Sequence, residues 1–243
     1  MGIFNFFKKK SVAELVLDET TQTTPTPTPN DKKSFMFEDF WIENGLLIKY
    51  YGKDENVILP ENVRVIGDYA FGGLKFLKSV KMTDAVCEIC TGAFEDCSYL
   101  TEVQFSRNVK TIGHHAFSKC ANLKDFTLPS SLTKIDYEAF AYCNGITEIV
   151  IPDTVTEMGE QVFKYCNNLN KIKLPNGLKT IPRYMFNGCI SLQFVYLPDS
   201  VDVIGDGAFC NCLKLERIAV SKGLQKIKVG TDVFYGCKSL KKY

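Results

Sequence analysis

Cysteine and histidine are the residues in this sequence whose types and spacing could carry chemistry. Cys87 and Cys90 form a C-x-x-C pair, a spacing that elsewhere holds zinc or performs dithiol redox chemistry. A structural zinc site needs four ligands, and no second pair lies at ligand spacing. Cys90 also adjoins Ile89, which has the pattern of a buried residue. We therefore expect no metal site, no redox centre and no cofactor.

The two histidines of the chain, His114 and His115, are adjacent. A Ser-His-Asp or Cys-His arrangement would need one of them as its base, and no nucleophile elbow lies nearby. The sequence also has no phosphate-binding loop and no metalloprotease helix signature. Both histidines fall in a variable pair before Ala116 and Phe117, which predicts exposed spacer residues. We therefore expect no catalytic residues and a protein that is not an enzyme.

A repeat of 23 residues organises most of the chain. It is clearest in a column of phenylalanines, with two residues inserted before the last: Phe71, Phe94, Phe117, Phe140, Phe163, Phe186, Phe209 and Phe234. Periods of about 20 to 29 residues are typical of stacked units that are each too small to bury their own apolar face. Such an array is one domain that offers an extended surface, so the sequence favours binding over catalysis.

Seven of the ten cysteines occupy one repeat position, which Leu74 fills in the first repeat. A position that accepts Leu or Cys predicts a small buried hydrophobic residue, which free cysteine resembles. Reduced thiols favour a reducing compartment and hence a cytoplasmic location. The alternative is disulfides between neighbouring repeats, since strands about 5 Å apart lie within the Cα range of a disulfide. Two features argue against disulfides. The column holds an odd number of cysteines, seven, and side chains stacked in parallel do not point at one another.

The repeat unit between Leu192 and Cys212 reads as a short strand followed by a return segment. Alternation predicts that Phe194 and Tyr196 face outward, while these residues face the core: Leu192, Val195 and Leu197. Pro198 then ends the strand, because proline cannot donate to a sheet ladder. The return segment buries Phe209 between repeats. The unit therefore predicts a β-rich solenoid.

Glycine recurs at one further repeat position, as Gly67, Gly113, Gly159 and Gly205. Pro182 occupies the same position in another repeat and requires φ near −65°. Glycine is therefore not expected to adopt a left-handed conformation there, and close packing between repeats is the predicted reason for it.

The unit resembles the leucine-rich repeats of the BspA type, and the resemblance runs from Val57 to the C-terminus over about eight copies. It implies a curved solenoid with a parallel sheet on the concave face and short strands or 3-10 turns opposite. Proteins that look like this are often bacterial cell-surface adhesins or surface proteins of mucosal protists. This chain departs from that pattern because it lacks a signal peptide and a C-terminal sorting segment. This departure argues against cell-surface display, which is therefore kept as the alternative to the cytoplasmic location.

Three segments precede the repeats. Residues 1–19 form an amphipathic segment whose order of aromatics before lysines is the reverse of a signal peptide. A weak membrane contact would use Ile3, Phe4, Phe7, Lys8, Lys9 and Lys10. The alternative for this segment is a frayed terminus. Residues 20–34 form a Thr/Pro-rich linker, which favours an extended spacer.

Residues 35–56 are predicted to cap the solenoid. Asn44-Gly45 supplies the two positive φ values of a type I′ turn, so the surrounding residues predict a β-hairpin. We expect this hairpin, with Trp41, to cover the open apolar end of residues 57–243. At the other end, Tyr243 falls at the first core position of a ninth strand with no evident cap, which predicts self-association at that edge.

The predicted outward columns of the strands hold the candidate binding residues. The chain carries 29 Lys and Arg against 28 Asp and Glu, so no overall field favours nucleic acid. The outward positions are not scrambled, because they form an acidic ladder and then a basic group around two aromatics: Glu102, Asp125 and Glu148, then Lys171, Lys173 and Arg217 around Phe194 and Tyr196.

Exposed aromatics beside Arg are typical of interface anchors. The first hypothesis is a scaffold that binds another protein, or a glycan, on the concave face. The others are a surface adhesin and a membrane-recruited adapter. An ordinary solvated sheet face is the alternative without function.

Overall fold

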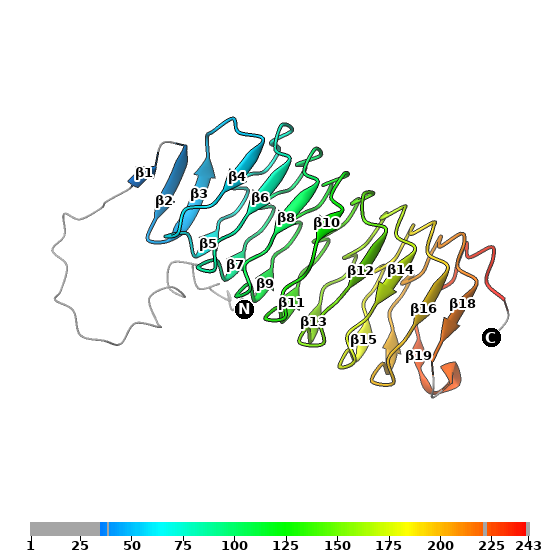
Figure 1. Cartoon of the computed structure of the whole chain (residues 1–243). Helices are drawn as coiled ribbons and strands as arrows, with labels where there is room; N and C mark the ends of the chain where they lie inside the picture. Colours follow the sequence, from blue (N-terminus) through cyan, green and yellow to red (C-terminus); the bar gives the residue numbers. More distant parts are fainter. Residues whose placement is uncertain (1–34, 38, 221–222, 242–243) are drawn as a thin grey trace, which may run out of the picture.

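The computed structural model describes residues 35–37, 39–220 and 223–241. The predicted N-terminal segment with its membrane-contact residues, the Thr/Pro-rich linker and Tyr243 lie outside the described residues. Within them, the chain forms a solenoid in which each repeat makes one rung with two short strands (Figure 1).

One strand of each rung forms the front face, which corresponds to the face predicted to be concave. Its strands are β4 (Asn56–Ile58), β6 (Ser79–Lys81), β8 (Glu102–Gln104), β10 (Asp125–Phe126), β12 (Glu148–Val150), β14 (Lys171–Lys173), β16 (Phe194–Tyr196) and β18 (Arg217–Ala219). Paired strands are parallel and in register at a step of one repeat, as in Val80 opposite Val103. The predicted parallel sheet is therefore confirmed.

The opposite strand of each rung forms the back face. Its strands have two residues each: β5 (Val65–Ile66), β7 (Glu88–Ile89), β9 (Thr111–Ile112), β11 (Lys134–Ile135), β13 (Glu157–Met158), β15 (Thr180–Ile181), β17 (Val203–Ile204) and β19 (Lys228–Val229). The described part adds one 3-10 helix, η1 (Leu224–Lys226). Short strands opposite the main sheet are thus confirmed.

The phenylalanine column runs through the core between the two faces. Seven of its rings, from Phe71 to Phe209, are fully buried, and Phe234 packs against them. Neighbouring rings stack with centroids 4.9 to 5.9 Å apart and planes within 19° of parallel. Each ring therefore buries a face against both neighbouring rungs, which no single repeat could achieve alone.

The N-terminal cap contains the predicted hairpin and one strand more. Strands β2 (Phe40–Glu43) and β3 (Leu46–Tyr50) pair antiparallel across Asn44 and Gly45, whose φ values are 50° and 82°. The unpredicted β1 (Phe35–Phe37) pairs antiparallel with β2. Because β3 pairs with β5, the cap extends the back face only.

The predicted role of Trp41 in the cap is wrong. Its ring is partly exposed, and its Nε1 donates to Glu43 Oε1 at 3.1 Å. Instead, Tyr50 continues the phenylalanine column, with its ring 5.2 Å from Phe71, and Phe40 covers Tyr50 at 4.9 Å. The end of the core is thus closed by Tyr50, which extends the column, and by Phe40 of β2, and not by Trp41.

The sheets are interrupted at three places. On the front face, no ladder joins β10 to β12 or β14 to β16, and on the back face none joins β13 to β15. At the first interruption, Phe126 occupies a core position that holds Val or Ile in the other rungs, and it stays partly exposed. Its larger ring stacks on Phe140 at 5.8 Å and meets Phe105 edge-on at 6.1 Å. We attribute the interruption between β10 and β12 to this extra bulk.

The recurrent glycines serve close packing, as predicted. A Cβ on Gly113 would lie 2.9 Å from the backbone carbon of Cys90, and one on Gly159 would lie 2.6 Å from that of Asp136. Glycine alternates with other residues at this position as far as Gly205, so each residue with a Cβ faces glycine on both neighbours: Gly67, Cys90, Gly113, Asp136, Gly159, Pro182, Gly205 and Gly230. None of these glycines has a positive φ.

Left-handed backbone occurs at two other positions of each rung. One column contains Tyr69, His115, Glu138, Gln161, Tyr184 and Asp232, and the other contains Asp96, Lys119, Tyr142, Tyr165 and Asn211. Their φ values lie between 50° and 63°. The conformation costs about 1 kcal/mol or more for residues other than glycine, so packing between rungs must offset it.

Candidate functional site

The candidate site is the pair of outward columns on the front face. In each three-residue strand, the residues on either side of the buried central position point to solvent, and the parallel register aligns them between paired rungs. Phe194 and Tyr196 therefore flank Val195, which is fully buried. The alternation predicted from the sequence is confirmed here.

The structure divides the predicted acidic ladder. Glu102 on β8 lies directly opposite Asp125 on β10, and Gln104 Nε2 donates to Glu102 Oε1 at 2.8 Å. Glu148 lies beyond the interruption between β10 and β12 and has Lys171 opposite it, with Nζ 3.3 Å from Oε2. The three acids therefore lie on successive rungs but not within one continuous sheet. Two adjacent carboxylates remain, followed by an exposed ion pair worth at most about 1 kcal/mol.

The aromatic pair on β16 is the main apolar feature among the candidate residues. The exposed fractions are 46% for Phe194 and 48% for Tyr196. On β18, Arg217 lies opposite Phe194 and Ala219 lies opposite Tyr196. Lys171 and Lys173 occupy the same two columns on β14, one repeat earlier. Cations therefore stand on both sides of the aromatic rung, as the sequence predicted.

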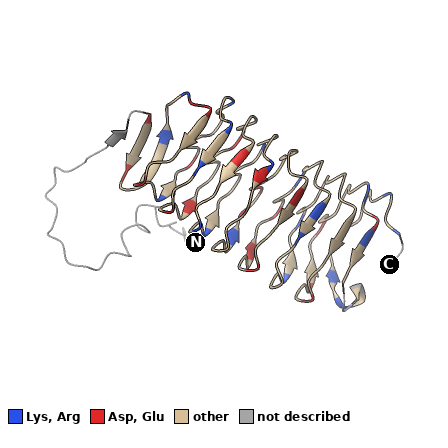
Figure 2. Cartoon of the chain, in the orientation of Figure 1, with Lys and Arg blue, Asp and Glu red and all other residues tan. Residues whose placement is uncertain are grey.

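Charge divides the front face along the solenoid. Figure 2 shows acidic residues on β8, β10 and β12, and basic residues on β14 and β18 on either side of β16. A partner with complementary charges would meet a negative region on β8 to β12 and a positive, aromatic region on β14 to β18. The arrangement can fix the orientation of a bound partner more than it adds affinity.

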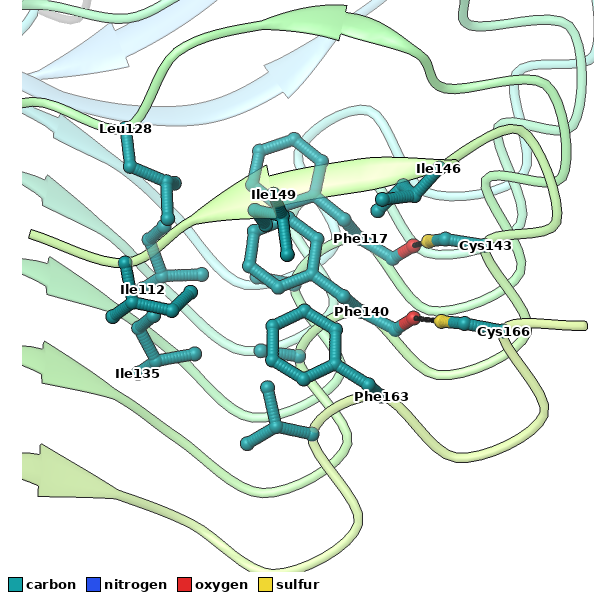
Figure 3. Packing of buried hydrophobic residues seen from close by; sticks show 14 of the residues in the cluster. Ile112, Phe117, Leu128, Ile135, Phe140, Cys143, Ile146, Ile149, Phe163 and Cys166 are labelled. Atoms are coloured by element: carbon teal, nitrogen blue, oxygen red, sulfur yellow. Dashed lines mark hydrogen bonds between the residues drawn. The ribbon is translucent and has the colours of Figure 1, made fainter. Parts of the chain in front are cut away.

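The cysteine column has a role that sequence reasoning missed. Each thiol donates to the carbonyl of the phenylalanine one rung earlier, as Cys143 Sγ does to Phe117 O at 3.0 Å and Cys166 Sγ to Phe140 O at 3.1 Å (Figure 3). The bond recurs in all seven copies, between 3.0 and 3.1 Å. The residue is therefore a buried donor as well as a small hydrophobic residue.

None of the ten cysteines is part of a disulfide. Burial raises the pKa of Cys97 and Cys166 to about 12 and that of Cys143 well above its usual range, so these thiols are protonated at neutral pH. Cys90 is buried and its pKa is likewise raised to about 12, whereas Cys87 Sγ contacts Arg64 O at 3.4 Å. In the described part of the chain, no group of three or more His, Cys, Asp or Glu is placed to hold a metal ion.

The histidines are partly exposed, but each has an acidic partner that the sequence analysis did not predict. His114 Nε2 lies 3.2 Å from Asp136 Oδ2, and His115 Nδ1 lies 3.4 Å from Glu138 Oε2, both on the next rung. The ring of His115 meets Tyr137 edge-on at 5.3 Å. Burial opposes ionisation of Asp136, but hydrogen bonds from Lys134 and from the backbone of Tyr137 outweigh it and lower its pKa. This cluster links two rungs through contacts between imidazole and carboxylate groups.

These features define a leucine-rich repeat solenoid with an open, charged sheet face. The family described as BspA type leucine rich repeat region matches residues 49–170 and 159–243. The chain therefore belongs to the BspA-type leucine-rich repeat family, which confirms the resemblance inferred from the sequence. The family and fold are those of repeat-based interaction or adhesion proteins and are typically non-enzymatic.

Two solved structures support the same assignment. A leucine-rich repeat protein from Bacteroides ovatus superposes with a TM-score of 0.67 at 26% identity, covering 85% of this chain and 67% of that chain. The leucine-rich repeat protein of T. pallidum gives a TM-score of 0.66 at 28% identity, covering 81% and 83%. No curated protein matches the sequence. Among the described residues, no helix has the length and apolarity that crossing a bilayer requires.

Proposed function

We propose that this protein is a non-enzymatic scaffold that binds a partner protein across the front face. Phe194 and Tyr196 are the anchors of the proposed site, and Glu102 and Asp125 orient the partner from the acidic region. The observation that carries the proposal is the exposure of two aromatic rings on one strand, between rungs that carry Lys171, Lys173 and Arg217. Aromatic residues beside Arg are enriched at the energetic centres of interfaces.

The size of the expected effect follows from the exposed rings. An aromatic side chain offers about 150 to 250 Å² for burial, and roughly half of each ring is still exposed here. Covering both rings would remove about 200 Å² of apolar surface from water, worth about 5 kcal/mol at ~25 cal/mol per Å². Part of this is offset by ordering and desolvation of the interface.

The test compares two variants of the full chain in partner capture. Proteins captured from lysate of the source cells by the unmodified chain are quantified again with Phe194→Ala/Tyr196→Ala and with Ile58→Ala. Ile58 is a matched control because it is 66% exposed on β4, in the same column as Tyr196. We expect the double variant to bind the captured partner at least 100-fold more weakly and Ile58→Ala to bind it normally. Equal binding by all three proteins would refute the site.

We also propose a cytoplasmic location, supported by the free cysteines. Labelling with a thiol probe and protease treatment of intact and lysed source cells tests it. Repeats that are cut or labelled only after lysis support it, and access from outside favours the adhesin. Liposome sedimentation with and without residues 1–10 tests the membrane-recruited adapter. The mass in solution at high protein concentration tests self-association at the C-terminal edge.

A further inference from the structure

The interruption of the back face between β13 and β15 has an identifiable cause. In the neighbouring rungs, the residue of the glycine column donates its N–H to the preceding rung, as Gly159 does to Ile135 O and Gly205 to Ile181 O, both at 2.8 Å. Pro182 occupies this position in the rung between them and has no N–H to donate to Met158. Across the described chain, no backbone hydrogen bond joins residues 156–159 to residues 179–182.

The two rungs stay joined on their other side. Gln161 N–H donates to Arg183 O at 3.0 Å, and Phe163 N–H donates to Met185 O at 3.0 Å. The rings of Phe163 and Phe186 still stack at 5.9 Å. The separation is therefore confined to the back face, where β13 and β15 are neighbours in Figure 1. A groove of about 690 Å³ lies over this place.

The floor of the groove is apolar. Met158 is only partly buried, whereas Ile135 and Ile181 at the same position of the adjacent rungs are fully buried. The other apolar side chains of the lining are those of Leu178, Pro182, Val203 and Ile204. An unbranched methionine with three rotatable bonds adapts to different apolar ligands, so it is suited to a binding surface.

The rim of the groove is charged, with opposite signs at its two ends. Lys134 pairs with Asp136 at 2.9 Å, and Arg183 pairs with Asp206 at 3.3 Å, so these four charges are largely balanced. The remaining charged residues of the lining are acidic on the β13 rung and basic on the β15 and β19 rungs: Glu157, Glu160, Lys179 and Lys228. A ligand that fits this groove carries a cation at one end and an anion at the other.

We propose that the groove binds an extended peptide segment of a partner protein. A basic side chain lies towards Glu157 and Glu160, and an acidic side chain lies towards Lys179 and Lys228. The lining spans five rungs, about 19 Å at ~4.8 Å per rung, which an extended peptide covers with about six residues. The peptide therefore lies across the strands, along the solenoid, and passes over the interruption between β13 and β15. This site is distinct from the front face and independent of the function proposed for it.

Three synthetic peptides test the charge arrangement on the full chain. The first is acetyl-Lys-Thr-Val-Val-Thr-Glu-amide with a fluorescent label, and the others carry Lys at both ends or Glu at both ends. We expect the first to bind at least 10-fold more tightly than the other two by fluorescence anisotropy. Equal affinities, or no binding by the first peptide at millimolar protein concentration, would overturn the proposal.

Pro182→Ala tests the role of the proline. Alanine restores the N–H, and its Cβ is accommodated because Gly159 and Gly205 stand on the neighbouring rungs. We expect the variant to fold, to protect the new amide from hydrogen exchange and to weaken the first peptide at least 10-fold. An unprotected amide at residue 182, or undiminished binding with a protected amide, would contradict the inference. Phe194→Ala/Tyr196→Ala should leave peptide binding unchanged, and a loss there would assign the peptide to the front face.

Discussion

Cys143 provides the sharpest test of how the cysteine column joins neighbouring rungs. Its side chain is fully buried, and its Sγ donates to Phe117 O at 3.0 Å. The same carbonyl also accepts the N–H of Cys120 at 3.1 Å. Removing the thiol therefore does not leave the carbonyl without a donor, so the cost of Cys143→Ala is the loss of packing and of one weak hydrogen bond.

The magnitude follows from these two contributions. Removing one buried atom of methylene size costs about 0.8 kcal/mol in transfer free energy. A residual cavity of roughly 20 Å³ adds about 0.5 kcal/mol. The lost S–H donor adds about 0.5 kcal/mol, at the low end for a neutral hydrogen bond. We expect Cys143→Ala to lower the free energy of unfolding by about 2 kcal/mol.

Cys143→Ser separates the donor role from simple space filling. Serine keeps a donor that can reach Phe117 O, so we expect it to cost about 1 kcal/mol, less than alanine. If the position were only apolar, serine would be the worse variant, because an unpartnered buried hydroxyl costs about 1–3 kcal/mol. The assay is urea unfolding followed by circular dichroism, with Cys210→Ala as the control outside the column and an expected change below about 0.5 kcal/mol. A larger loss for serine than for alanine would refute the reasoning.

Two further predictions concern thiol reactivity and the glycine column. In the folded protein, a maleimide should label only the three partly exposed cysteines, Cys87, Cys210 and Cys237, with the other seven labelled after unfolding. The hydrogen bond with Cys212 lowers the pKa of Cys237, while burial raises that of Cys210, so labelling of Cys237 should begin at the lower pH; the reverse order would contradict these shifts. Gly159→Ala should lower the free energy of unfolding by more than 2 kcal/mol, because its Cβ would lie 2.6 Å from the backbone carbon of Asp136. Gly177→Ala is the control, because no heavy atom lies within 4 Å of a Cβ built there, and it should be neutral or stabilising by up to about 1 kcal/mol. If thermal unfolding showed comparable losses of stability for Gly159→Ala and Gly177→Ala, close packing at Gly159 would be contradicted.

The fold could be predicted from the sequence because the residues that each structural requirement demands recur in several repeats. The period locates the phenylalanine column, and alternation within one unit places Phe194 and Tyr196 outside and Val195 inside. The glycine column could be interpreted because Pro182 excludes a left-handed conformation there. Repetition thus allows one informative copy to settle a question about all the others.

Other features cannot be predicted from the repeat period, because they depend on contacts between particular rungs. The partners of His114 and His115 lie on the next rung, where Asp136 and Glu138 happen to be acidic. The left-handed positions hold Tyr, His, Glu, Gln and Lys as well as Gly, Asp and Asn, so composition marks them only weakly. The thiol donor was missed because Leu74 fills the position in the first repeat and suggests a purely apolar site.

The departures from the repeat carry the information that the repeat itself lacks. Identical rungs would form continuous ladders and uniform faces, with no place distinguished from another. Phe126 and Pro182 change inward or backbone positions, and each coincides with an interruption of a sheet. Phe194 and Tyr196 change outward positions and alter what the front face presents without disturbing the buried Val195. In this solenoid, an inward departure therefore changes the continuity of a sheet, and an outward departure changes the surface that a partner would meet.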